Sequence, residues 1–126
     1  MVRWYVVVLS ALALSLLAIF IFSEQGFDES RWYKLEEAKE ISNKTKKEIF
    51  VFVSSKICPT CMEFKKFFSG EVMNRIESKY VPVFLEFPRD QIPFKVYSFP
   101  TFCIGREEFK CFATNSPEDL MRRLGV

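Results

Sequence analysis

The chain has 126 residues, 49% of them apolar, and its 18 basic and 16 acidic side chains give a net charge of +2. This length excludes two full domains, and fifteen phenylalanines exclude a disordered chain because they can bury a core. The near balance of charge argues against a nucleic-acid partner, and the absence of histidine excludes every site that needs an imidazole.

The N-terminus contains one long apolar segment. Residues 4–22 carry no charge and are all apolar except for two serines. As a helix they would match a bilayer core of about 30 Å. The segment ends in bulky residues, whereas signal peptidase needs small ones, so we predict an uncleaved signal anchor over residues 1–23. The alternatives are a cleaved signal peptide and a buried helix. Arg3 favours a cytoplasmic N-terminus and a domain outside the cytoplasm, in the periplasm or at the cell surface.

A polar tether at residues 24–29 leads to one domain, which we expect over residues 30–126. Apolar residues at helical spacing predict a helix at the start of this domain: Trp32, Leu35, Ala38 and Ile41. The uninterrupted apolar run of residues 49–53 is typical of a central strand that is buried on both faces.

The remaining predicted elements alternate between strands and helices. They are a loop at 54–57, a helix from 58 that Gly70 interrupts, a buried strand at 81–87, an irregular or briefly helical segment at 90–99, a hairpin of residues 101–105 and 109–114, and a last helix capped by Ser116. This order fits an α/β sandwich with a mixed sheet.

The motif Cys58-Pro59-Thr60-Cys61 follows directly after the first buried strand and begins the next helix. The helix dipole and free N–H groups at that place favour a thiolate on Cys58. Cys61, one turn later, is placed to attack a mixed disulfide formed at Cys58. Pro59 suits a first helical turn, and we expect Lys56, Pro59 and Thr60 to modulate the reactivity of the pair.

The cysteine spacings leave alternatives open. A Cys-x-x-Cys motif can also be half of a zinc knuckle, although the position between strand and helix favours redox chemistry. If the hairpin turn centres near Glu107, Cys103 and Cys111 lie opposite each other, so we predict a structural disulfide or, alternatively, a free buried Cys103. A zinc site of all four cysteines is disfavoured because the second pair is too widely spaced, and we expect no metal.

These residues resemble the thioredoxin-like or thioredoxin-related group of thioredoxin-fold proteins. The resemblance covers about residues 30–126 and depends on five segments: Trp32 with Leu35 to Ala38, Ile49 to Val53, Cys58 to Cys61, Val81 to Val83, and Phe99-Pro100-Thr101. It implies a thioredoxin fold, in which helices flank a central mixed sheet. With the apolar N-terminus, the full expectation is this fold preceded by one transmembrane helix.

The resemblance also implies roles for the residues around the second proline motif. Pro100 would be cis and would face Cys58, whereas the alternative is an ordinary trans turn proline. Phe99 would offer backbone hydrogen bonds to an extended substrate segment. We expect Thr101 and Ile57 to belong to the same substrate-binding surface.

Two positions depart from the family pattern. Ile57 stands where thioredoxins usually carry a tryptophan, and Phe52 stands where they carry a buried aspartate that helps to move the proton of the second thiol. Glu86, late in the second strand, either replaces that acid or is an ordinary carboxylate at the end of a strand.

We therefore predict a membrane-anchored extracytoplasmic thiol–disulfide oxidoreductase that acts on protein substrates through Cys58 and Cys61. We expect a monomer without metal or organic cofactor, and another protein that recycles the pair. One alternative is a non-catalytic module that docks a partner at the groove of Phe99 and Pro100. The other is a thiolate copper carrier that uses Cys58, Cys61 and Met62. The direction of electron flow stays open.

Overall fold

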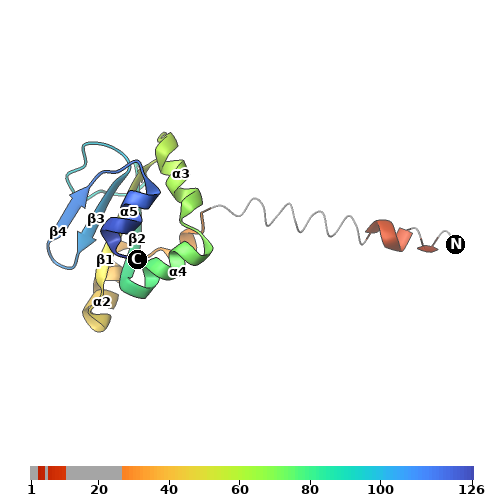
Figure 1. The fold of residues 1–126 in the computed structure, drawn as a ribbon, viewed down its shortest axis with the longest axis horizontal. Coiled ribbons are helices and arrows are strands. Elements are labelled where there is room, and N and C mark those ends of the chain that lie inside the picture. The colour runs from red at the N-terminus through yellow and green to blue at the C-terminus, as the bar shows by residue number, and fades with distance from the viewer. Residues whose placement is uncertain (1–2, 5, 11–26) are drawn as a thin grey trace.

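The computed structural model describes residues 3–4, 6–10 and 27–126 of the chain (Figure 1). Most of the predicted signal anchor and tether lies outside these described residues. Within the part that is described, no helix is both long and apolar enough to span a bilayer.

Four strands form one mixed sheet in the order β2-β1-β3-β4. Their bounds are β1 Glu48–Ser55, β2 Tyr80–Phe87, β3 Thr101–Gly105 and β4 Phe109–Phe112. β1 pairs in parallel with β2 and antiparallel with β3, which itself pairs antiparallel with β4. β1 therefore lies inside the sheet, and β4 lies at its outer edge (Figure 1).

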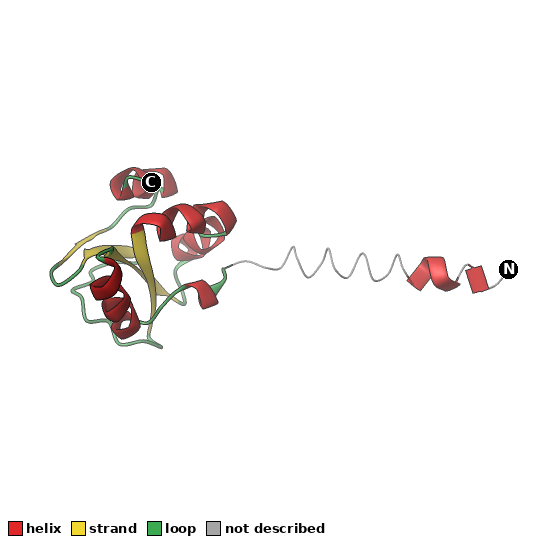
Figure 2. Cartoon of the chain, turned by 90° about the horizontal axis from the view of Figure 1, so that it is seen from below, coloured by secondary structure: helices red, strands yellow, loops and turns green. Residues whose placement is uncertain are grey.

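The helices divide between the two faces of the sheet, as Figure 2 shows. Their bounds are α2 Leu35–Thr45, α3 Pro59–Phe67, α4 Gly70–Lys79 and α5 Pro117–Leu124. Apolar side chains of α3, α4 and α5 pack on one face, and those of α2 pack on the other together with residues 88–100. That connection forms neither helix nor strand, in agreement with the irregular segment expected there.

The central strand explains why its sequence is apolar without alternation. Successive side chains of a strand point to opposite faces. Phe50 and Phe52 therefore enter the aromatic cluster under α3 and α5, where Phe52 lies 5.1 Å from Phe68 between ring centroids. The intervening residues of β1 enter the α2 face instead: Ile49, Val51 and Val53. Both faces of β1 are buried, as the sequence predicts.

The helix boundaries follow local signals. α3 ends at Phe67 and α4 begins at Gly70, which has a φ of +49°, so the helical segment is broken at the predicted interruption. Ser116 caps α5, because its hydroxyl accepts a hydrogen bond of 3.2 Å from the backbone N–H of Asp119. The predicted second strand of the hairpin ends earlier than expected, at Phe112 rather than at Thr114.

The structure corrects the prediction that Trp32 begins the first helix. Trp32 follows a short 3-10 turn, η1 Glu29–Arg31, and packs on the α3 face, opposite to α2. The next residue, Tyr33, bridges to the edge of β2, and its N–H donates to the Pro82 carbonyl over 2.9 Å. This extended link lets α2 begin only at Leu35, although the spacing of Trp32 matches that of the helical residues.

Candidate active site

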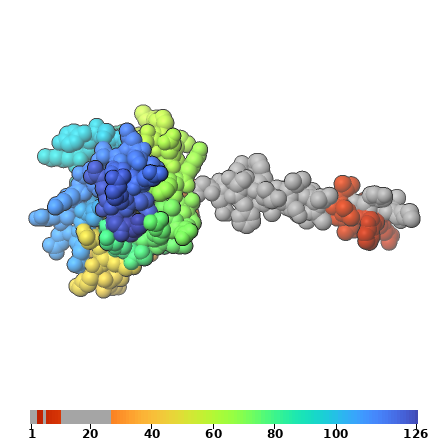
Figure 3. Space-filling view, viewed as in Figure 1, coloured from red at the N-terminus to blue at the C-terminus, as the bar shows by residue number. Residues whose placement is uncertain are grey.

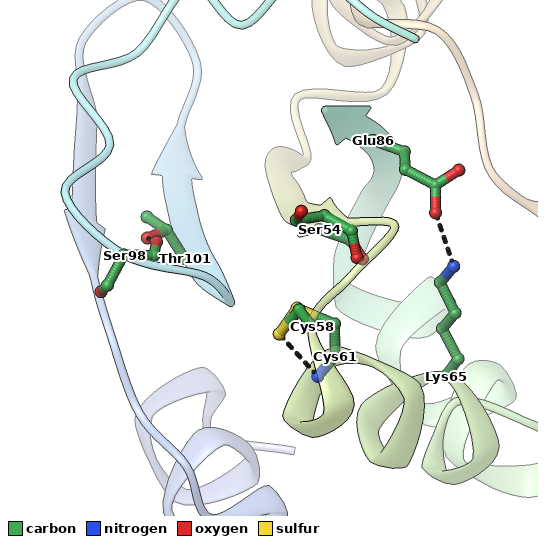
Figure 4. Close-up of a disulfide and its surroundings, with 8 residues drawn as sticks. Ser54, Cys58, Cys61, Lys65, Glu86, Ser98 and Thr101 are labelled. Carbon is green, nitrogen blue, oxygen red and sulfur yellow. Dashed lines mark hydrogen bonds and ion pairs between the residues drawn. A yellow bond between two sulfur atoms is a disulfide. The ribbon is translucent and has the colours of Figure 1, made fainter. Parts of the chain in front are cut away.

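The pair Cys58–Cys61 forms a disulfide at the end of the sheet where β1 finishes (Figure 4). Cys58 is the N-cap of α3, with extended backbone angles and Pro59 in the first turn. Its sulfur accepts a hydrogen bond of 3.1 Å from the backbone N–H of Cys61. The N-cap position leaves N–H groups without partners in the helix. The loop thus aims a backbone donor and the positive end of the α3 dipole at the Cys58 sulfur.

The two sulfurs differ in their access to solvent. Cys61 is completely buried in the aromatic cluster, whereas Cys58 is only half-buried. Ile57, immediately before it, is 90% exposed. A sulfur atom of another molecule can therefore reach Cys58. The buried Cys61 is accessible only to groups within the protein, such as the Cys58 sulfur.

The segment before β3 reaches the same edge of the sheet. The Phe99–Pro100 peptide bond is cis, as the resemblance implies, and the alternative of an ordinary trans turn proline is wrong. Thr101 pairs with Val53 near the end of β1, and its hydroxyl donates to the Ser98 carbonyl over 2.6 Å. Figure 4 shows Ser98 and Thr101 in the surroundings of the disulfide. A second cis bond, Phe87–Pro88, was not predicted, because nothing in its sequence distinguishes it from a trans proline.

The end of β2 and the segment before the cis proline carry exposed apolar side chains. Phe87 is 50% exposed and stacks on Phe99, with their ring centroids 5.9 Å apart. The carbonyl of Phe87 accepts a hydrogen bond from the backbone N–H of Lys56 in the loop before Cys58. Tyr97, two residues before Phe99, is 92% exposed. Sequence reasoning missed Phe87, although β1 and β2 are parallel and must end at the same edge.

The other predicted modulating residues lie on the surface of the loop and the first helical turn. Lys56 and Pro59 are exposed, and Thr60 is half-buried between the two cysteines. Met62, on the first turn of α3, is 56% exposed. The structure thus gathers the predicted site residues at one end of the sheet, and their roles stay predictions.

A partly buried ion pair lies beside this site. Lys65, one turn beyond Cys61 on α3, contacts the Glu86 carboxylate at 2.8 Å, and Glu86 is only 8% exposed. Ser54 is opposite Glu86 in the β1–β2 register and is fully buried. Figure 4 shows Glu86 pointing toward Lys65, with Ser54 between this pair and the disulfide. This arrangement favours the interpretation of Glu86 as a structural carboxylate over that of a proton acceptor for Cys61.

Asp90 anchors the turn after β2. Its carboxylate accepts a hydrogen bond of 2.9 Å from the backbone N–H of Glu86 and pairs with Arg89 at 2.9 Å. Burial alone would raise the pKa of Asp90, but the hydrogen bonds from Arg89 and Glu86 outweigh it and hold that pKa below its ordinary value. Arg89 also pairs with Glu29 at 2.6 Å, and both carboxylates keep its pKa raised. The end of β2 is thereby tied to η1.

A second disulfide joins Cys103 on β3 to Cys111 on β4. The two residues are direct partners in the antiparallel register, with their Cα atoms 4.0 Å apart. All four cysteines are therefore paired, two within the motif and two within the hairpin. The alternative of a free buried Cys103 is wrong.

A family model described as thioredoxin-like matches residues 31–104, which is more than half of the chain. The chain belongs to the thioredoxin-like family. An uncharacterized protein of Archaeoglobus fulgidus is 38% identical over 119 residues, which cover 92% of this chain and 93% of that protein.

Solved structures show the thioredoxin fold as well. A thioredoxin from Thermus thermophilus aligns with a TM-score of 0.61 and 21% identity over 75% of this chain and 84% of that one. A DsbH oxidoreductase gives a TM-score of 0.58 and 18% identity over 80% and 86% of the two chains. The germline-specific thioredoxin Deadhead of Drosophila melanogaster gives 0.55 and 20% over 75% and 94%. The predicted fold of the thioredoxin-like domain, with its mixed sheet between helices, is confirmed.

Proposed function

We propose that this thioredoxin-like protein is a thiol–disulfide oxidoreductase that exchanges disulfides with protein substrates through Cys58 and Cys61. The observation that carries the proposal is the difference between the two sulfurs. Cys58 is accessible at a helix N-terminus that favours its thiolate, and Cys61 is buried one turn away with its sulfur bonded to that of Cys58.

In the reducing direction, the Cys58 thiolate attacks one sulfur of a substrate disulfide, and the other substrate sulfur leaves as a thiolate that takes up a proton. The Cys61 thiol then loses its proton and attacks the Cys58 sulfur. This breaks the mixed disulfide and releases the second substrate thiol. The substrate gains two electrons and two protons, and the Cys58–Cys61 disulfide forms. The oxidising direction reverses each step, and no metal or organic cofactor takes part.

The surroundings of Cys58 suit an extended polypeptide as the substrate. Ile57, which directly precedes Cys58, presents exposed apolar surface beside the disulfide. The exposed ring of Phe87, whose carbonyl accepts from the Lys56 N–H, extends this surface and stacks on Phe99. Apolar surface of this kind buries the apolar side chains that flank a cysteine in an unfolded or flexible chain. The backbone of Phe99 and Thr101, on either side of the cis Pro100, would pair with that chain.

We propose in addition that residues 4–22 anchor the protein in a membrane as a single span, with the domain outside the cytoplasm. The apolar run supports the anchor, and a disulfide in the hairpin away from the redox motif supports an oxidising compartment. The domain would act as a monomer and be recycled by another protein. Extraction of membranes with alkaline carbonate tests the anchor: an anchored protein stays in the pellet, and a protein found in the supernatant would contradict the proposal.

The enzyme proposal is tested by trapping the mixed disulfide. In the full chain with Cys61→Ser, the Cys58 thiolate should form a stable adduct with a disulfide-bonded protein substrate, visible by non-reducing electrophoresis and mass spectrometry. The matched control, Cys58→Ser, retains the buried Cys61 and should form no adduct. Equal adducts with both variants, or none with either, would refute the assigned roles. A partner bound without any covalent adduct would support the docking module, and copper retained on purification would support the metal carrier.

A further inference from the structure

The hairpin disulfide joins one buried cysteine to one exposed cysteine. Cys103 is fully buried on the α2 face, in the cluster that includes Val51 and Val53. Cys111 is exposed on β4, the strand at the outer edge of the sheet. Figure 3 shows the hairpin at the rim of the domain. A disulfide that only holds two strands together has no need of an accessible sulfur, and exposed disulfides are the ones that thiols reduce readily.

We propose that Cys103–Cys111 is a second thiol-exchange site, open at Cys111 to the thiolate of a low-molecular-weight thiol or of a dithiol protein. The exchange takes place in the folded protein. The site is separate from Cys58–Cys61, because Cys61 belongs to the aromatic cluster on the opposite face of the sheet.

The fold can hold the hairpin when this bond is open. β3 and β4 form four paired positions, and aromatic contacts secure β4 on both faces of the sheet. On the α2 face, Phe109 lies 5.1 Å from Phe94 between ring centroids. On the other face, Phe112 lies 5.9 Å from Phe102 and under the Arg123 guanidinium at 4.9 Å. A free Cys103 would fill its place as a small apolar side chain.

The reaction balances with two thiols as the reductant. A thiolate attacks the Cys111 sulfur, the disulfide breaks, and the electron pair goes to the Cys103 sulfur, which takes up a proton. A second thiolate attacks the reductant sulfur of the mixed disulfide and releases Cys111, which is protonated in turn. Two external thiols become one disulfide, and Cys103 and Cys111 become thiols. Because Cys103 is buried in apolar surroundings, it is a poor leaving thiolate, so we expect slower exchange than at Cys58.

The test uses the full chain with Cys58→Ser and Cys61→Ser, which retains only the second pair and is therefore independent of the enzyme proposal. The folded variant is treated with reduced glutathione over a tenfold range of concentration, quenched with acid, alkylated and mapped by mass spectrometry. We expect the rate of opening to rise tenfold with the thiol, glutathione to be trapped on Cys111, and the circular dichroism spectrum to remain that of the folded protein.

A rate that is independent of thiol concentration and equal to the rate of global unfolding would overturn the proposal, because the bond would then open only in the unfolded chain. Glutathione trapped on Cys103 alone would overturn it as well. If the double variant does not fold, the same measurement is made on the wild-type chain, in which mass spectrometry maps the opening of Cys103–Cys111 separately from that of Cys58–Cys61.

Discussion

The two disulfides of this protein lie in one small sheet, yet their surroundings differ. Each has one accessible and one buried sulfur. At Cys58 the accessible sulfur caps α3 and receives a backbone N–H, whereas at Cys111 it lies on an edge strand without a helix N-terminus behind it. Accessibility is shared by Cys58 and Cys111, whereas the helix N-terminus favours a thiolate at Cys58 alone, so we expect faster thiol exchange there.

The largest expected effect is the loss of disulfide-reducing activity when the Cys58–Cys61 pair, but not the Cys103–Cys111 pair, is removed. Cys58→Ser should abolish reduction of a disulfide-bonded protein substrate. Of the four cysteines, only Cys58 has an accessible sulfur at a helix N-terminus with a second cysteine placed to resolve the mixed disulfide. The matched control, Cys103→Ala with Cys111→Ala, should retain turnover. The measurement is the steady-state rate of substrate thiol release. Loss of activity in the control but not in Cys58→Ser would reverse the assignment of the two pairs.

The next effect concerns the partly buried ion pair of Lys65 and Glu86 beside the redox motif. Glu86→Gln leaves the ammonium of Lys65, on α3, without its carboxylate partner. It should lower the free energy of unfolding by about 3 kcal/mol, the low end of the cost of breaking a buried pair, because the Lys65 side chain is 23% exposed. The control, Glu77→Gln, removes a more exposed pair with Arg31 and should cost less than about 1 kcal/mol. Denaturant unfolding measures both.

Glu86→Gln also tests the interpretation of Glu86 as a structural carboxylate. If that interpretation is right, the rate at which Cys61 resolves the mixed disulfide should keep its wild-type pH profile in the folded variant. A resolution step that slows and shifts its pH profile would instead assign Glu86 to proton transfer.

Removal of the hairpin disulfide should have a slightly smaller effect on stability. Closing the short loop between Cys103 and Cys111 stabilises the fold by about 2–3 kcal/mol, because it restricts the unfolded chain. Cys103→Ala with Cys111→Ala should lower the unfolding free energy by that amount in denaturant titrations. A variant that does not fold at all would show that the contacts of Phe109 and Phe112 cannot hold β4 without the bond, against the inference drawn from them.

The smallest expected effect is a change in how the stability of the protein depends on pH, and it concerns Asp90 after β2. The pKa of Asp90 lies below its ordinary value of 3.8 in the folded protein, so Asp90 contributes its full stabilisation above that value. The contribution is lost as the pH falls through the folded pKa. Asp90→Asn should therefore weaken the loss of stability in acid, measured as denaturant midpoints from about pH 6 to about pH 2. If the stability of Asp90→Asn fell in acid as steeply as that of the wild type, the role given to Asp90 would be contradicted.

Much of this architecture could be predicted from sequence, because several signals act locally. Each of three elements is determined by a few residues: β1 by its apolar run, the start of α4 by Gly70, and the start of α5 by the Ser116 cap. Cys58 and Cys61 could be proposed as the redox pair for the same reason, since their position between a strand and a helix is visible in the sequence.

The missed features depend on contacts between distant segments. Trp32 has helical spacing, yet the bridge of Tyr33 to β2 keeps the chain extended until Leu35. Phe87 reaches the active site only because β2 ends beside β1, and the surroundings of Glu86 include Lys65 from another element. Residue spacing along one segment carries no information on such neighbours.

The central claim is tested most directly by a redox titration of the Cys58–Cys61 pair. The full chain is equilibrated in glutathione buffers of known potential, its thiols are alkylated, and the labelled cysteines are located by mass spectrometry. We predict that Cys58 and Cys61 change state together, with a midpoint between about −270 and −120 mV, the range of thioredoxin-fold oxidoreductases. A pair that stays closed across that whole range, or that a bound metal shields from alkylation, would contradict the account.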